Sequence, residues 1–282
     1  MDFHRWSSLV RRYDLGLGYN RLILLLTGAA VASGAAVGWL DGLPLSQVAW
    51  RAFAGGVTVF VAAVLAKEID PDHPRSAVLA AALAIPTLWL ARLSGLSFLL
   101  WLVLMLRFVN RSTGLAPKVT DTLALLAVTA WVGWAVSPFL AILAGGVLVL
   151  DGLLPDGRRA HVLPGVLVAL AATAWLLLGA GLSTPTPSSP ELTIVLLAVA
   201  VAFIGVILAS YQITAVGDAT GRPLQVARVQ AAQAVGLGVA LLMASWAGPE
   251  GVVLASALWA ALLGAVAMRL IHARTHRSVT TG

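Results

Sequence analysis

The amino-acid sequence predicts an all-α integral membrane protein of about ten transmembrane helices. Of its 282 residues, 60% are hydrophobic and 11% are charged, whereas soluble domains carry about 25% charged residues. Apolar runs of membrane-spanning length recur from Leu22 to Ile271 with little between them. Lysine and arginine gather on alternate loops. These observations exclude a soluble core and favour a chain that lies mostly in the bilayer.

Charged and turn-forming residues mark the ends of the predicted spans. Lys67 follows the second span, where a cation suits the C-terminal dipole, and Pro74 fits the first turn of the third. The Ser/Thr/Pro stretch from Ser183 to Pro190 cannot be regular helix, and Gly248-Pro249-Glu250 links the last two spans. The predicted spans are residues 22–40, 47–66, 76–91, 96–109, 119–136, 138–154, 162–182, 191–213, 225–246 and 251–271.

The basic segment 1–21 has two interpretations. Its apolar residues recur at helical spacing between arginines, which is typical of an amphipathic helix at the headgroup level. The alternative is an ordinary basic flank to the first span. Within that span, Ala30-Val31-Ala32 resembles a signal-peptidase site. Because the apolar run is long enough to cross a bilayer, we expect this span to be retained.

The loop charges favour ten spans over fewer. Only Arg92-Leu93-Ser94-Gly95 separates the third and fourth spans, and only Ser137-Pro138 separates the fifth and sixth. Short cytoplasmic loops collect Lys and Arg. With ten spans, all but two of the 18 Lys and Arg residues lie on one side of the membrane. The pattern predicts a single membrane domain over 22–272 in the cytoplasmic (inner) membrane, a tail over 273–282, and both termini in the cytoplasm.

A short motif occurs twice in the chain. The pattern PDxxRxxVL stands at residues 71–79 and again at 155–163, and a weaker match relates Thr113-Gly114 to Thr220-Gly221. A parallel tandem repeat of four-helix units, spans 2–5 and 6–9, would place all four loops on the cytoplasmic face. The alternative is a chance match in a chain rich in Val, Leu and Pro.

The densest polar cluster lies in the loop after the second span. Carboxylates and an imidazole at a membrane surface could ligate a divalent ion that a phosphate-bearing substrate would share. The alternative is that these charges complement helix dipoles and form turns. The candidate residues of this loop are Glu68, Asp70, Asp72, His73 and Arg75.

The other cytoplasmic loops supply further candidates, and two spans supply a polar lining. The loop residues suit anion binding at turns, or plain turn chemistry and helix capping. They are Asn110, Arg111, Asp156, Arg159, Asp218 and Arg222. Amide and hydroxyl side chains could line a path or bond across a helix interface. They are Ser210, Gln212, Gln230 and Gln233.

Several activities have no motif in this chain. There is no phosphate-binding P-loop, no dinucleotide fingerprint after a strand, no zinc-type Cys/His spacing, no nucleophile elbow and no cysteine. We therefore assign no metal site, catalytic residue or cofactor. The basic residues are dispersed singly, so membrane topology explains them better than nucleic acid does. No ionisable residue stands near mid-membrane, which counts against an ion-coupled carrier.

Three hypotheses remain for the function. Helix number and length resemble the drug/metabolite transporter superfamily, which implies a carrier of a small molecule or lipid, our leading expectation. The acidic loops after spans 2 and 6 resemble the placement of the aspartate-rich motifs in UbiA-type prenyltransferases, which implies an enzyme acting on a lipid or prenyl diphosphate at the cytoplasmic face. That family's repeated Asp at a spacing of four is absent here. The third hypothesis is a non-catalytic membrane subunit or scaffold.

Overall fold

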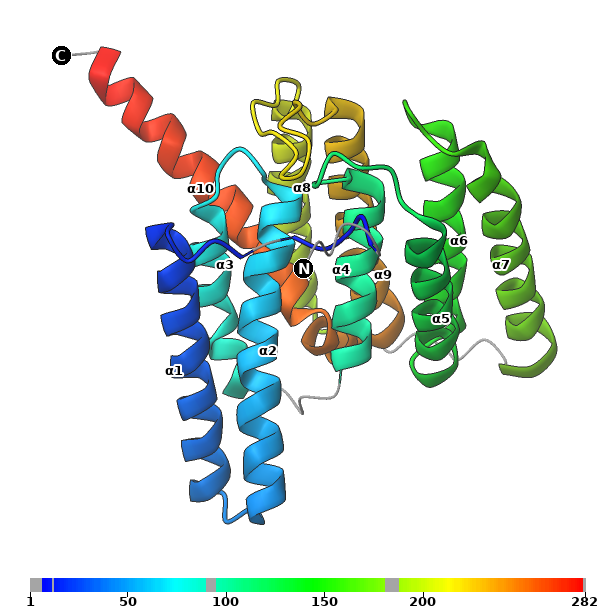
Figure 1. Cartoon of the computed structure of the whole chain (residues 1–282). Coiled ribbons are helices and arrows are strands. Elements are labelled where there is room, and N and C mark those ends of the chain that lie inside the picture. Colours follow the sequence, from blue (N-terminus) through cyan, green and yellow to red (C-terminus); the bar gives the residue numbers. More distant parts are fainter. Residues whose placement is uncertain (1–6, 12, 90–94, 181–187, 281–282) are drawn as a thin grey trace. The chain divides into compact units, whose positions relative to one another are not determined.

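The computed structural model describes residues 7–11, 13–89, 95–180 and 188–280, of which 89, 179, 180 and 276–280 are described in their backbone alone. Helices make up most of this part of the chain, and its one β-bridge is the isolated pair Val216 and Pro223 (Figure 1). The helices are α1 (Gly18–Leu40), α2 (Leu45–Ile69), α3 (Ser76–Ala84), α4 (Leu96–Asn110), α5 (Val119–Ala135), α6 (Pro138–Leu153), α7 (Val162–Trp175), α8 (Pro190–Ala209), α9 (Val226–Leu254) and α10 (Ser256–Thr280). Short helical turns are η2 (Pro86–Trp89), η3 (Arg159–His161) and η4 (Leu176–Ala180).

Six helical segments are long and apolar enough to cross a membrane. They are Gly18–Leu40, Leu45–Ile69, Arg159–Leu178, Pro190–Ala209, Val226–Leu254 and Ser256–Thr275. Four further apolar helices are shorter: Ser76–Leu88, Leu96–Asn110, Val119–Ala135 and Pro138–Leu153. At about 1.5 Å per residue these four fall short of a hydrocarbon core of about 30 Å. The predicted all-helical class is therefore confirmed, and the six long apolar helices are compatible with a multi-pass membrane protein, whereas ten complete spans remain a prediction.

The structure changes several predicted ends. The predicted break at Gly248-Pro249-Glu250 falls inside α9, where two helical stretches meet at Gly248, whose backbone is not helical and whose φ is 54°. Helix α8 ends at Ala209, four residues before the predicted end. The described residues between Ser7 and Leu17 form no helix, so the basic-flank interpretation suits them better than the amphipathic helix does. Ser137 caps α6, accepting a bond from the Phe139 amide at 3.3 Å.

Two of the predicted connections between spans lie mostly outside the described residues. The predicted break at Arg92-Leu93-Ser94-Gly95 falls mostly within 90–94, and the connection from Ser183 to Pro190 falls mostly within 181–187.

The chain divides into two compact units. Unit 1 comprises residues 1–12, 97–185 and 210–239, and unit 2 comprises 13–96, 186–209 and 240–282. Unit 1 thus contains α4 to α7 and the first half of α9, while unit 2 contains α1 to α3, α8 and α10. The four-helix units of the predicted repeat do not coincide with this division, because spans 2 and 3 lie in unit 2 and spans 6 and 7 in unit 1.

Small residues let the helices of unit 2 approach closely. A Cβ on Gly34 would lie 2.9 Å from the Arg51 carbonyl oxygen, and one on Gly38 would lie 3.3 Å from the Val48 Cα. Gly34 and Gly38, four residues apart in α1, therefore mark the contact between the antiparallel helices α1 and α2 (Figure 1). Helix α3 packs on α2 and α10, and a Cβ on Gly264 would lie 2.7 Å from the Ser76 carbonyl oxygen.

Unit 1 is built on α4 and on the α6–α7 hairpin. Helix α4 buries a row of large side chains, and its Trp101 indole donates to the Thr129 hydroxyl of α5 at 3.2 Å. Helices α6 and α7 meet at Gly145 and Gly165, where a Cβ on either glycine would lie 2.6 Å from the carbonyl oxygen of the other. This close approach of the two backbones fixes the position of the last turn of α6 against α7.

Candidate functional site

A buried carboxylate stands where α2 ends in unit 2. Asp70 is the C-terminal cap of α2 and is fully buried. Its Oδ1 atom accepts a hydrogen bond from Arg269 Nη2 of α10 at 3.1 Å and lies 3.0 Å from His73 Nδ1. Its Oδ2 atom is buried and has no hydrogen-bond partner. One oxygen thus serves both basic side chains.

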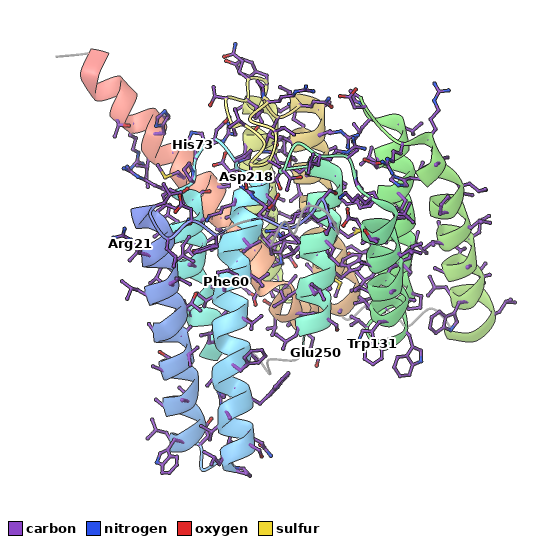
Figure 2. The ribbon with its side chains drawn as sticks, viewed as in Figure 1. Arg21, Phe60, His73, Trp131, Asp218 and Glu250 are labelled. Atoms are coloured by element: carbon purple, nitrogen blue, oxygen red, sulfur yellow. The ribbon has the colours of Figure 1, made fainter. Side chains whose placement is uncertain are left out.

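His73 sits where the loop after α2 meets α10 (Figure 2). The hydrogen bond to Asp70 raises the pKa of His73 above its ordinary value of 6.5, while burial and the charge of Arg269 lower it and the charges of Asp70 and Asp72 raise it further. Its ring lies edge-on to His272 of α10, with centroids 5.3 Å apart. His73 is therefore protonated to a higher pH than an isolated histidine.

These basic side chains border a pocket between α8 and α10. Its volume is about 500 Å³, within the range of about 300–1,000 Å³ that is usual for small-molecule sites. The walls are apolar, and the ionisable residues of the lining, His73, Arg269 and His272, are all basic. The other lining residues are Ala202, Gly205, Val206, Ala209, Val266, Leu270 and Ala273.

The remaining candidates of the loop after α2 do not line this pocket. Glu68 is fully buried in the last turn of α2, Asp72 is half-buried and Arg75 is exposed. Among the residues that the structure describes, no three His, Asp or Glu side chains are grouped so as to hold a metal ion. The divalent-ion interpretation of this loop therefore finds no ligand set there.

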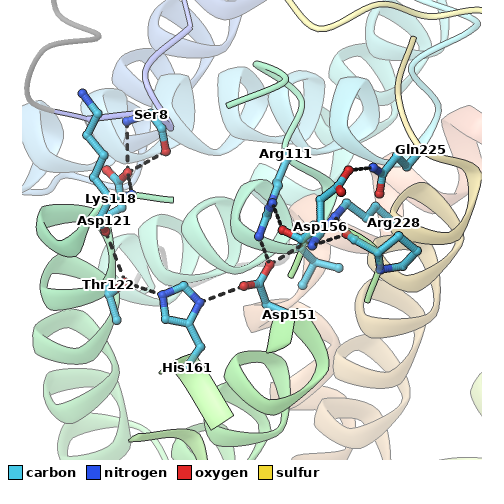
Figure 3. A network of polar contacts seen from close by, with 12 residues as sticks. Ser8, Arg111, Lys118, Asp121, Thr122, Asp151, Asp156, His161, Gln225 and Arg228 are labelled. Carbon is cyan, nitrogen blue, oxygen red and sulfur yellow. Dashed lines mark hydrogen bonds and ion pairs between the residues drawn. The ribbon is translucent and has the colours of Figure 1, made fainter. Parts of the chain in front are cut away.

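A second polar cluster lies in unit 1 around Asp151, in the last turn of α6 (Figure 3). Asp151 is fully buried. Its Oδ1 atom accepts from Arg111 Nη2 and from Arg228 Nη1, each at 2.8 Å, and its Oδ2 atom lies 2.7 Å from His161 Nδ1. The other ring nitrogen of His161 lies 3.2 Å from the hydroxyl of Thr122. This network joins α5, α6 and α9 to the loop after α4.

The two arginines also bind the carbonyls at helix ends. Arg228 donates to the carbonyl oxygens of Val109 at 3.0 Å and of Pro155 at 2.9 and 3.0 Å, and Arg111 donates to that of Asp156 at 2.7 Å. These groups end α4 and follow α6, where cations are favourable. Burial lowers the pKa of Arg111, as does the nearby Arg228, and Asp151 opposes both. The cluster therefore links the C-terminal end of α4 to the residues that follow α6.

An N-terminal strap, residues 7–11, crosses the same face of unit 1. Ser7 and Ser8 donate from their hydroxyls to the Asp121 carboxylate at 2.5 and 2.6 Å, and the Ser8 amide donates to it at 3.0 Å. Arg107 donates to the Leu9 carbonyl oxygen at 3.1 Å, and Arg11 pairs with Asp218. The strap thus adds three hydrogen bonds to a carboxylate that also caps α5 by accepting from the Lys118 amide at 2.8 Å.

Three of the four predicted loops meet in unit 1. The amides of Asp218 and Ala219 donate to the carbonyl oxygens of Ser112 and Thr113 at 3.3 and 3.0 Å. Exposed Asp156 binds the Gln225 side chain. Asn110 is buried, whereas Arg159 and Arg222 are exposed. These candidates serve loop packing more than a shared cavity.

The predicted polar lining is only partly assembled. Gln233 donates to the buried Ser210 hydroxyl at 3.0 Å, which matches the interhelical alternative. Gln212 is exposed and Gln230 is half-buried.

Sequence reasoning did not select Asp151, His161, Arg228, Arg269 or His272. A signal was present, because a charged residue inside an apolar span is costly and must find partners. The spacing along the chain does not tell which partners those are. Comparison with known proteins finds no family model, no curated protein and no solved structure that matches this chain.

Proposed function

We propose that this chain is a multi-pass carrier of the cytoplasmic membrane, with both termini inside, and that it binds an amphiphilic molecule between α8 and α10. The observation that carries this proposal is the pocket of about 500 Å³, whose apolar walls end in basic side chains. Binding sites for small molecules are mostly apolar with a few placed polar groups. An amphiphile has the same division into an apolar and a polar part.

The α8 wall is made of small residues, which is why the pocket exists. Ala202, Gly205 and Ala209 leave the space that larger side chains would fill, and a Cβ on Gly205 would meet nothing within 4 Å. Helix α8 belongs to the segments that are long and apolar enough to cross a membrane. A molecule of the bilayer can therefore reach this wall without passing through water.

The enzyme hypothesis has less support. The residues that the structure describes contain no group of three His, Cys, Asp or Glu side chains that could hold the metal ion of a diphosphate site. The scaffold hypothesis predicts that the pocket has no role in any flux, and the test below separates it from a carrier.

Filling the pocket is expected to stop carriage without unfolding the protein. In Gly205→Leu the new side chain enters open space, and replacing a helix-interior glycine favours the helix by about 0.5–1 kcal/mol. The measurement is the rate at which a fluorescent phospholipid moves between the two leaflets of vesicles that contain the purified protein. A membrane-impermeant quencher detects the lipid in the outer leaflet. We expect the wild-type rate to fall to the protein-free rate.

Gly28→Leu is the matched control. Gly28 lies in α1 of the same unit, also has open space around it, and does not line the pocket. Its flux should equal that of the wild type. Equal flux in Gly205→Leu and Gly28→Leu would contradict a carrier that uses this pocket, and protein-free rates for the wild type would favour the scaffold.

A further inference from the structure

We propose that the pocket between α8 and α10 selects an anionic head group, and that its occupant is an anionic phospholipid of the surrounding bilayer. This inference rests on the proposed function and names its substrate class. It follows from the arrangement of apolar and basic residues along two neighbouring helices.

The two helices present matching stripes to the pocket. On α8 the lining residues are Ala202, Gly205, Val206 and Ala209, at the spacing i, i+3, i+4 and i+7. Such a series lies on one face of a helix. The four α10 positions at the same spacing are Val266, Arg269, Leu270 and Ala273. The stripes form two walls suited to an acyl chain, and Arg269 is the only ionisable residue in either stripe.

Three basic side chains gather at one part of this lining. His73 comes from the loop after α2, and His272 follows Arg269 by one turn of α10. An arginine offers a planar fork of donors that matches a phosphate group. A phosphodiester offers anionic acceptor oxygens to these basic side chains on the pocket side, whereas a neutral head group adds no charge there.

Asp70 holds two of these groups in position and does not itself line the pocket. Its Oδ1 atom contacts both Arg269 and His73, at 3.1 and 3.0 Å. Asp70 pairs with two of the three basic side chains, and Asp72 is a second acidic neighbour of His73. Neither carboxylate lines the pocket, so the ionisable residues of the lining are all basic while Asp70 holds Arg269 and His73 through its Oδ1 atom.

The test compares lipids that share their acyl chains and differ in charge. Detergent-purified full-length protein is titrated with phosphatidylglycerol, phosphatidylcholine and diacylglycerol, and bound lipid is counted by native mass spectrometry. We expect phosphatidylglycerol to bind about tenfold more tightly than the others, since diacylglycerol lacks the phosphodiester and phosphatidylcholine carries a choline cation that the basic lining repels. Inorganic phosphate alone should not displace it, because it lacks the acyl chain.

Removing the basic groups should remove the preference. His272 is exposed, so His272→Gln should fold normally and bind phosphatidylglycerol several-fold more weakly. Arg274→Gln is its matched control, an exposed basic residue on the same helix that does not line the pocket. Arg269→Gln should lose the preference for phosphatidylglycerol. If Arg269→Gln folds poorly, Arg269→Lys replaces it in the test, and because it keeps the charge near Asp70 it should retain part of the preference.

The binding should also depend on pH. His73 is charged below its pKa, which Asp70 raises above 6.5. The attraction of His73 for the phosphate is therefore complete below pH 6.5 and is lost as the pH rises through that raised value. In His73→Gln the affinity should be lower at acidic pH and should change less with pH than in the wild type, because one of the two histidines of the lining is gone. Arg269, His272, Asp70 and Asp72 face the same ring and remain in that variant.

The outcomes separate this inference from the proposed function. Equal binding of all three lipids, still blocked by Gly205→Leu, overturns the head-group selection and leaves the carrier standing. Binding that Gly205→Leu does not reduce overturns both. Displacement by inorganic phosphate alone overturns the lipid as occupant.

Discussion

Replacing Asp151 with asparagine is expected to destabilise unit 1 by about 3–5 kcal/mol, because it leaves buried cations without their counter-charge. The carboxylate accepts two arginine hydrogen bonds on Oδ1 and faces His161 with Oδ2. An asparagine side chain has one acceptor oxygen, so its NH₂ group must face either the arginines or the histidine. With its oxygen toward the arginines, the NH₂ group can meet His161 only if Nδ1 of that ring is unprotonated, and in either rotamer the arginines lose their counter-charge. Thermal unfolding of the purified protein in detergent, followed by near-ultraviolet circular dichroism, measures the loss.

Asp156→Asn is the control for this prediction. Asp156 is exposed, and its contacts use a backbone carbonyl and one carboxylate oxygen. Its φ is 56°, a left-handed conformation that asparagine adopts readily. The midpoint of unfolding should therefore stay close to that of the wild type. A drop as large as that of Asp151→Asn would mean that charge removal on this face, and not burial of unpaired arginines, sets the stability.

Replacing Gly145 with valine is expected to separate α6 from α7 and to cost about 1–3 kcal/mol or more. A Cβ at this position would lie 2.6 Å from the Gly165 carbonyl oxygen and 2.9 Å from the Ala169 amide nitrogen. Both neighbours are backbone atoms of α7, so no rotamer change relieves the clash and the helix itself must move. We expect a lower unfolding midpoint and faster proteolysis of the purified protein.

Gly146→Val provides the comparison one residue along. A Cβ there meets nothing within 4 Å, and the position is exposed. Valine at either position changes helix propensity by the same amount, so the difference between the two variants isolates the contact between helices. Equal stabilities for the two variants would show that α6 and α7 do not pack closely through Gly145.

The candidate site was only half predictable. The loop after α2 attracted attention because it concentrates acidic and basic residues, and two of them, Asp70 and His73, do meet. Their partners Arg269 and His272 come from the other end of the chain. From the sequence alone, each of those residues is indistinguishable from an ordinary basic flank at the end of the last span.

The Asp151 network shows the same division. The sequence places one carboxylate in an apolar span, and burial then requires partners. Arg111 is forty residues away in the chain and Arg228 is seventy-seven residues away. Only the packing of α4, α5, α6 and α9 makes these residues neighbours.

By itself the sequence determined the all-helical class and the apolar segments that are compatible with a membrane, because apolar periodicity and the hydrogen-bonding demands of a bilayer leave few alternatives. It also located most helix ends, since prolines, glycines and charges act on their immediate neighbours. The tertiary structure decided how helices were divided between two units and which side chains border the pocket between α8 and α10. Those properties depend on contacts between distant segments, whose energies arise only once the helices have packed.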